Sequence, residues 1–148
     1  MNDVRDISHD EARVAELVRS ARRVAVLGIK TEAHADQPAF YVPSYLQSAG
    51  LTVIPVPVYY PEVKVILGQQ VYRRLADVPG PIDIVDVFRR GQDVTGHLDD
   101  LLAARPRSVW LQSGIRNDKV AERLIEVGIT VVQSRCLMVD HQRFAGRG

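Results

Sequence analysis

The run Val24-Ala25-Val26-Leu27-Gly28-Ile29 decides the fold class of this chain. It is short, apolar and rich in valine, which is typical of a strand buried on both faces in a parallel sheet. Further stretches of the same character lie at residues 51–56, 82–88, 108–112 and 129–132. The sequence therefore predicts five strands that are buried within a sheet.

Helical patterns lie between these predicted strands. They cover residues 9–21, the stretch from Asp36 to Gly50, residues 93–104, and the stretch from Asn117 to Gly128. Strands that alternate with helices form a parallel sheet through right-handed crossovers, because that hand lets each helix pack back on the sheet. We predict an α/β fold, a three-layer doubly wound Rossmann-like domain with a mainly parallel five-stranded sheet.

Local motifs give finer expectations. Ser8-His9-Asp10-Glu11 has the pattern of a capping box for the first helix. Pro38 and Pro43 predict that the second helix has a late or loosely formed first turn. Pro55 predicts that the second strand leaves the ladder near that residue. Residues 57–81 are predicted to be irregular apart from short elements at residues 63–68 and 71–75.

Length and composition limit the possible functions. A chain of 148 residues has the size of one domain, so we expect a single domain over residues 1–148 with its core at about 10–143. The net charge of +1 argues against nucleic acid or a membrane surface as a partner. The start lacks a signal-peptide pattern and no apolar run approaches the ~18 residues of a membrane span. A single cysteine requires no oxidising compartment, so we expect a cytoplasmic protein.

The residues that follow the strands lack two common nucleotide fingerprints. The first turn has Gly28 but no further glycine, and no acid follows the second strand before Glu62, so the NAD pattern is missing. No Walker phosphate loop occurs. The strand ends carry cations and aromatic rings instead: Lys30, Tyr59, Tyr60, Phe88, Arg89 and Arg90. Cations beside helix N-termini favour phosphates, which indicates a phosphorylated nucleotide other than NAD.

Several motifs occur in the order found in a known family. They are Val24–Gly28, Val53–Val56, Ile66–Gly68, Val71–Leu75, Asp83–Arg89, Val109–Ile115 and Arg135–Met138. With these motifs the chain resembles the stand-alone CoA-binding proteins, which are similar to the nucleotide-binding domain of the succinyl-CoA synthetase alpha subunit. The resemblance covers about residues 10–143.

The resemblance implies coenzyme A (CoA) as a ligand in the cleft at the strand ends. The site residues that it implies are Gly28, Ile29 and Lys30 for the phosphates, Val56 and Pro57 for the adenosine, and Phe88, Arg89, Gln112, Ser113 and Gly114 at the border of the site. In the synthetases the phosphohistidine belongs to a further domain, so synthetase activity is not expected here.

Two residues near the predicted site have alternative interpretations. Cys136, beside Arg135, could form a mixed disulfide with the thiol of CoA. We favour a small buried apolar side chain, because free cysteines are among the most buried residues. Gln112 ends a buried strand and needs a hydrogen-bond partner, which is either a ligand or a backbone group.

Other titratable residues are assigned structural roles. Asp83 and Asp86 could act as general bases, but we favour the interpretation that Asp86 orients a loop or an arginine. The histidines lack ligand spacing with Cys136, so no metal site is predicted.

The leading hypothesis is a cytoplasmic module that binds CoA or an acyl-CoA without catalysing a reaction. The sequence shows no nucleophile with a positioned base and no acid pair at a defined spacing. One alternative is a small CoA- or NAD(P)-dependent enzyme whose reacting groups come from a homodimer partner. Another is a docking subunit that needs a partner protein for chemistry.

Overall fold

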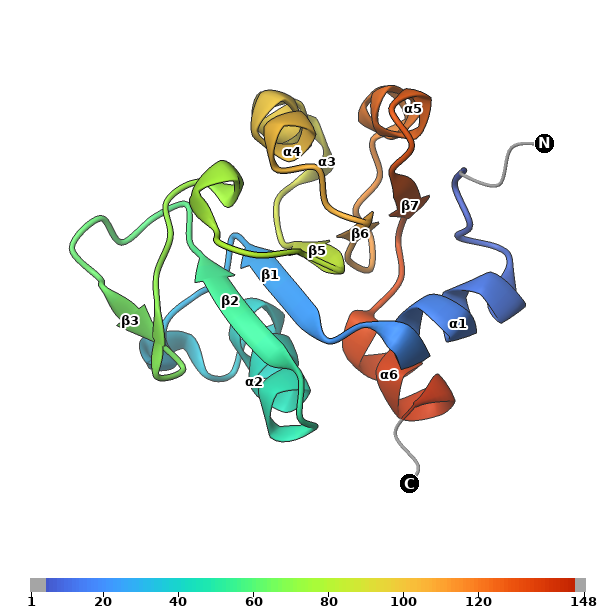
Figure 1. Ribbon diagram of the computed structural model, residues 1–148. Coiled ribbons are helices and arrows are strands. Elements are labelled where there is room, and N and C mark those ends of the chain that lie inside the picture. The colour runs from blue at the N-terminus through green and yellow to red at the C-terminus, as the bar shows by residue number, and fades with distance from the viewer. Residues whose placement is uncertain (1–4, 146–148) are drawn as a thin grey trace.

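The computed structural model describes residues 5–145 and contains one five-stranded sheet (Figure 1). Its strands are β1 (Arg23–Leu27), β2 (Thr52–Val56), β5 (Ile84–Val87), β6 (Ser108–Leu111) and β7 (Thr130–Val132). The order across the sheet is β2-β1-β5-β6-β7, and every neighbouring pair is parallel. The predicted fold class is confirmed.

Helices cover both faces of this sheet and give the three layers seen in Figure 1. One face carries α1 (Glu11–Ser20), α2 (Pro38–Ser48) and α6 (Leu137–Phe144). The other carries α3 (Gly91–Val94), α4 (Leu98–Ala104) and α5 (Asp118–Glu126). Short 3-10 turns connect them: η1 (Glu32–His34), η2 (Leu75–Asp77) and η3 (Thr95–His97).

The apolar core lies on both sides of the sheet. Along β1, Val24 and Val26 face the layer of α1, α2 and α6, whereas Ala25 and Leu27 face the opposite layer. Because both faces of the strand are buried, its sequence is a continuous apolar run and not an alternating one. Trp110 on β6 is fully buried in the first of these layers.

The start of α1 differs from the predicted capping box. The N-cap is Asp10, whose carboxylate accepts a hydrogen bond from Arg13 N at 3.2 Å. The Ser8 hydroxyl accepts a hydrogen bond from Gln133 N at 2.6 Å instead. The predicted Ser8 cap is wrong because the segment before α1 runs beside β7, where that hydroxyl is engaged.

Proline disturbs α2 and β2 less than predicted. The helix α2 begins at Pro38, where the missing N–H is harmless, and continues through Pro43. Pro43 leaves the carbonyl of Ala39 without a helical donor, and Lys30 N donates to that carbonyl at 3.1 Å. Pro55 stays in the ladder because β2 is an edge strand and its nitrogen lies on the side away from β1. The prediction for the first turn of α2 is wrong, whereas β2 does leave the ladder close to Pro55, one residue later at Val56.

The structure adds detail that the sequence pattern does not predict. Within residues 57–81, the short element expected at residues 63–68 contains β3 (Val65–Ile66), which forms an antiparallel hairpin with β4 (Gln69–Gln70). The helix α6 follows β7, and the helix expected at 93–104 is divided into α3, η3 and α4. No helix within residues 5–145 is long and apolar enough to cross a membrane.

Candidate functional site

A cavity of about 800 Å³ opens at the carboxyl ends of β1, β5 and β6. The strand order reverses between β1 and β5, and open α/β sheets bind ligands at such a point. The volume lies within the range of small-molecule and cofactor sites. The lining residues are Lys30, Gln37, Pro38, Ala39, Tyr41, Val42, Phe88, Arg89, Arg90, Gly91, Gln92, Gln112, Ser113, Gly114, Ile115 and Cys136.

The cavity brings together many of the residues predicted for the site. Those that line it are Lys30, Phe88, Arg89, Gln112, Ser113 and Gly114. Those outside its lining are Gly28, Ile29, Val56 and Pro57. Ile29 and Val56 lie in the core on opposite faces of the sheet, and Pro57 is also buried. Contacts of Val56 and Pro57 with adenosine therefore stay a prediction.

Gly28 acts on the cavity through the backbone. Its φ is +88°, which favours glycine, and a Cβ there would overlap the carbonyl oxygen of Phe88. Gly28 N donates to Val56 O at 2.9 Å. A glycine at this position lets β1 turn directly beside the end of β5, so that Phe88 and Arg89 reach the cavity.

Lys30 lies against the N-terminus of α2. Its backbone N–H bonds Ala39 O, and its ammonium group donates to the carboxamide oxygen of Gln37. Gln37 is the N-cap of α2 and makes no side-chain capping bond. A lysine ammonium and the positive end of a helix dipole therefore meet at one wall of the cavity.

Arg89 is a second cationic group in the cavity lining. Its side chain is only 17% exposed. Nε donates to His97 Nε2 at 3.2 Å, and Nη1 donates to the Tyr59 hydroxyl at 3.3 Å. The guanidinium also lies over the Tyr59 ring, 5.5 Å from its centroid. These contacts hold the guanidinium at the cavity wall.

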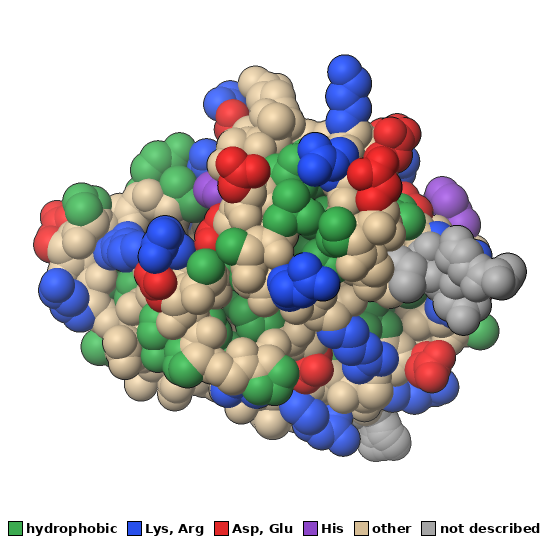
Figure 2. All heavy atoms as spheres, turned by 45° about the horizontal axis from the view of Figure 1, so that its top comes forward, with side chains coloured by type: hydrophobic (Ala, Val, Ile, Leu, Met, Phe, Trp, Pro, Cys, Tyr) green, Lys and Arg blue, Asp and Glu red, His purple; other side chains and the backbone are tan. Residues whose placement is uncertain are grey.

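The positive charge at this site comes from a few side chains and is not part of a broad basic surface. In the view of Figure 2, lysine and arginine side chains are interspersed with aspartate and glutamate. On that face the cations form no broad basic field, in keeping with a net charge of +1. Recognition of a phosphate would rest on individual side chains such as Lys30 and Arg89.

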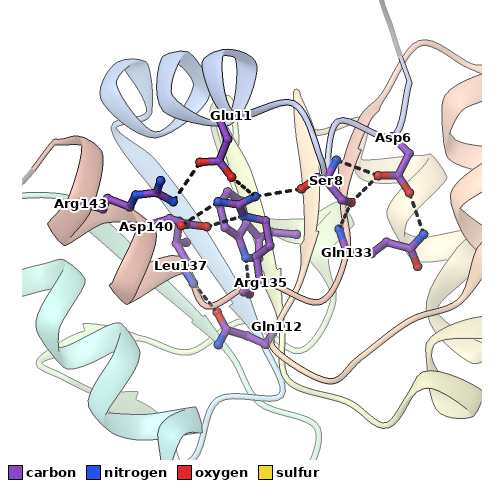
Figure 3. Close-up of polar contacts among 10 residues, drawn as sticks. Asp6, Ser8, Glu11, Gln112, Gln133, Arg135, Leu137, Asp140 and Arg143 are labelled. Carbon is purple, nitrogen blue, oxygen red and sulfur yellow. Dashed lines mark hydrogen bonds and ion pairs between the residues drawn. The ribbon is translucent and has the colours of Figure 1, made fainter.

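Gln112 has a backbone partner, as one of its two alternatives predicted. Its side-chain oxygen accepts a hydrogen bond from Leu137 N at 3.0 Å (Figure 3). This bond joins the end of β6 to the first turn of α6. Because Gln112 also lines the cavity, it ties the position of α6 to the site.

The guanidinium of Arg135 pairs with carboxylates on α1 and α6. It forms ion pairs with Asp140 at 2.7 Å and with Glu11 at 3.1 Å (Figure 3). The hydrogen bonds to Asp140, with those to Glu11, raise the pKa of the Arg135 guanidinium further above its usual range. Arg135 therefore has a structural role, and the ion pairs direct it toward α1 and α6.

Cys136 matches only in part the small buried apolar side chain that the sequence favoured. It packs against the core layer of α1, α2 and α6, but it is partly exposed and lines the cavity as the N-cap of α6. Its burial is incomplete because the N-cap position of α6 borders the cavity.

Asp83, just before β5, and Asp86, on β5, have different environments, and neither lines the cavity. Burial raises the pKa of Asp83, but hydrogen bonds from the N–H groups of Arg23 and Arg22 outweigh it and lower the pKa below its ordinary value. Asp86 is fully buried, and neither of its carboxylate oxygens has a hydrogen-bond partner within residues 5–145. The interpretation that Asp86 orients a loop or an arginine is wrong.

Most of the wall contributed by α2 and α3 was not predicted. Its unpredicted residues are Gln37, Pro38, Ala39, Tyr41, Val42, Gly91 and Gln92, whereas Arg90 is one of the cations predicted at the strand ends. A signal was available for α2, because Pro38 marks a first helical position and α2 is the next α-helix after β1. Within the described part of the chain, no three His, Cys, Asp or Glu residues are grouped to hold a metal ion.

Residues 22–142 match the family described as the CoA binding domain. This chain belongs to that family. The resemblance drawn from the strand motifs is thereby confirmed.

Individual proteins support the match. YneT of Bacillus subtilis is 32% identical over 131 residues, which cover 88% of this chain and 93% of YneT. The structure of cell-free ID.343 from Thermus thermophilus has a TM-score of 0.82 at 39% identity, covering 91% of this chain and 98% of that one. A hypothetical protein from Pyrococcus horikoshii OT3 has a TM-score of 0.82 at 25% identity, with coverage of 99% and 100%.

A larger enzyme contains the same fold. The dinucleotide-forming acetyl-coenzyme A synthetase 1 of Ca. Korarchaeum cryptofilum matches with a TM-score of 0.61 and 19% identity. The match covers 79% of this chain but 27% of the synthetase. At this identity the likeness concerns the fold alone.

Proposed function

We propose that the cavity binds CoA or an acyl-CoA, and that this chain is a binding module without chemistry of its own. The observation that carries the proposal is the meeting of Lys30, Arg89 and the N-terminus of α2 at one cavity. Two cations and the positive end of a helix favour a diphosphate. CoA, after which the family is named, contains one.

The lining of the cavity supports binding without catalysis. Among the described residues that line it, none is an aspartate, a glutamate or a histidine. This part of the chain therefore offers the ligand no carboxylate or imidazole as a general base. Catalysis would need reacting groups from a second copy or from another protein.

A calorimetric titration tests the binding. We expect saturable binding of CoA at neutral pH, weakened about tenfold or more by Lys30→Gln or Arg89→Gln, because each variant loses a charge-assisted hydrogen bond. Lys119→Gln is the matched control, since Lys119 is exposed on α5 and outside the cavity lining. We also expect affinity to fall with added salt.

Two results would contradict the proposed function. One is saturable binding of NAD(P) with no binding of CoA. The other is equal loss of affinity in Lys30→Gln and Lys119→Gln, which would show a general effect of charge and no site at Lys30.

Cys136 allows a test of the ligand's orientation. With the diphosphate near β1 and β5, the pantetheine arm can run along the sheet toward Cys136, which follows β7. The Cys136 thiolate would then attack the disulfide of oxidised CoA, forming a protein–CoA disulfide and releasing one CoA thiolate. We expect mass spectrometry to detect one CoA on Cys136, none on Cys136→Ser, and loss of the adduct with dithiothreitol. If no adduct forms at a saturating concentration of CoA disulfide, this orientation of the ligand is ruled out.

A further inference from the structure

The contacts of Arg89 leave part of its guanidinium open to a ligand. A guanidinium carries five N–H donors. Within residues 5–145, one bonds His97 Nε2 and one bonds the Tyr59 hydroxyl. The carboxylate of Asp93 lies 3.9 Å from Nη2, beyond hydrogen-bond distance, and bonds Arg90 instead. Two contacts thus fix the orientation of Arg89 while other donors stay available at the cavity.

His97 can accept the bond from Arg89 in one protonation state only. Arginine has no acceptor and is always charged, so Nε2 of His97 must carry no proton. This places the imidazole in the neutral form with its hydrogen on Nδ1. The residue lies in η3, between α3 and α4, and is outside the cavity lining.

The surroundings of His97 favour this neutral form. Burial lowers the pKa of His97 below its ordinary value of 6.5, and the charge of Arg89 lowers it further. Asp100 and Asp93 face His97 from α4 and α3 and act in the opposite direction. Both acids are engaged elsewhere, because Asp100 accepts hydrogen bonds from Leu75 N and Ala76 N, and Asp93 binds Arg90.

We propose that His97 is the positioning residue of the anion site, and that its protonation in acid releases Arg89 and weakens binding of the ligand's diphosphate. This inference rests on the proposed function, because it assigns Arg89 to a phosphate. A protonated His97 loses its acceptor and repels the guanidinium. Since His97 lies outside the lining, its new charge does not replace the lost contact.

The experiment measures affinity for dephospho-CoA between pH 8 and pH 5. CoA itself is unsuitable for the pH series, because its 3′-phosphate takes up a proton near pH 6. The diphosphate of dephospho-CoA stays ionised throughout. His97→Gln keeps an acceptor near the position of Nε2 but does not titrate, whereas His97→Phe has no acceptor.

We expect the affinity of the wild type to fall about tenfold as the pH drops below 6.5. His97→Gln should bind like the wild type at pH 7.5 and keep its affinity in acid, and His97→Phe should bind weakly at every pH. Nitrogen-15 NMR of the imidazole should show the hydrogen on Nδ1 at pH 7.5. Circular dichroism of each variant checks folding.

Failure of the inference and failure of the proposed function give different results. Suppose that the wild type binds dephospho-CoA at pH 7.5. The role of His97 is then overturned if His97→Gln loses affinity in acid as the wild type does. It is also overturned if His97→Phe binds normally. If the wild type binds neither dephospho-CoA nor CoA at pH 7.5, the proposed function itself fails, and the inference with it.

Discussion

Gly28→Ala should destabilise the fold by about 3 kcal/mol and abolish measurable CoA binding. The φ of Gly28 is +88°, where an alanine is strained by about 1–2 kcal/mol. The new Cβ would in addition overlap the carbonyl oxygen of Phe88 and lie 3.3 Å from Arg89 Cδ. Since these atoms belong to the backbone that follows β5 and to a site residue, relief of the overlap moves the cavity wall.

The chain offers a matched control for this substitution. Gly128 has a φ of +91°, and a Cβ there would have no atom within 4 Å. Gly128→Ala should therefore show the backbone strain without the overlap, and it should leave CoA affinity unchanged. Urea unfolding of both variants measures the difference. Equal losses of stability in the two variants would show that the contact with Phe88 contributes nothing.

Asp86→Asn should stabilise the protein at neutral pH, and the gain should depend on pH. Asp86 is 0% exposed, and its carboxylate lacks a hydrogen-bond partner within residues 5–145. Burial raises the pKa of Asp86 well above its ordinary value of 3.8. The folded protein thus holds Asp86 protonated at a pH where the unfolded chain has it ionised.

The sign of the effect follows from proton uptake. Below pH 3.8 both states carry the proton, so Asp86 adds no pH-dependent penalty. As the pH rises from there toward the raised pKa, folding must bind a proton, and stability falls by about 1.4 kcal/mol per pH unit. The carboxamide of the Asp86→Asn variant does not titrate, so the advantage of the variant should grow by this slope and then level off.

Chemical unfolding at several pH values tests the prediction on Asp86. The measured quantity is the difference in free energy of unfolding between Asp86→Asn and the wild type. Asp36→Asn, at an exposed position, should give a difference close to zero at every pH. A difference for Asp86→Asn that is also independent of pH would mean that Asp86 is ionised in the folded protein.

Much of the fold was predictable from local sequence. The five strands are buried on both faces, so each has an apolar run that stands out from its neighbours. The start of α5 was also predictable, because Asn117 accepts the N–H of Val120 as a side-chain cap within its own segment. Signals of this kind depend on residues close in the chain.

The helix α6 was missed because its buried face is partly polar. Asp140 and His141 are buried, whereas Val139 is half exposed, so the apolar periodicity of a surface helix is absent. The polar groups are satisfied by partners outside the helix: Arg135, just before α6, pairs with Asp140, and the Tyr45 hydroxyl on α2 lies 2.8 Å from His141 Nδ1. Apolar periodicity registers neither partner, and Tyr45 is 96 residues away in the chain.

The residues of the candidate site also fall into a predictable group and a group that only the tertiary structure shows. Residues that follow β1, β5 and β6 were predictable, because parallel strands bring their carboxyl ends to one edge. The wall from α2, the exposure of Cys136 and the bond from Arg89 to His97 depend on how helices pack across that edge.

The sequence by itself determined the fold class, the order along the chain of the five sheet strands and the helices between them, and the family, because apolar runs and motifs are properties of neighbouring residues. The tertiary structure alone decided which predicted residues meet in the cavity and which lie in the core. It also decided that Asp86 has no partner among the described residues and that Arg89 is held by a histidine. Burial and hydrogen bonding of these side chains are set by residues from other elements, so they exist only once the layers have packed.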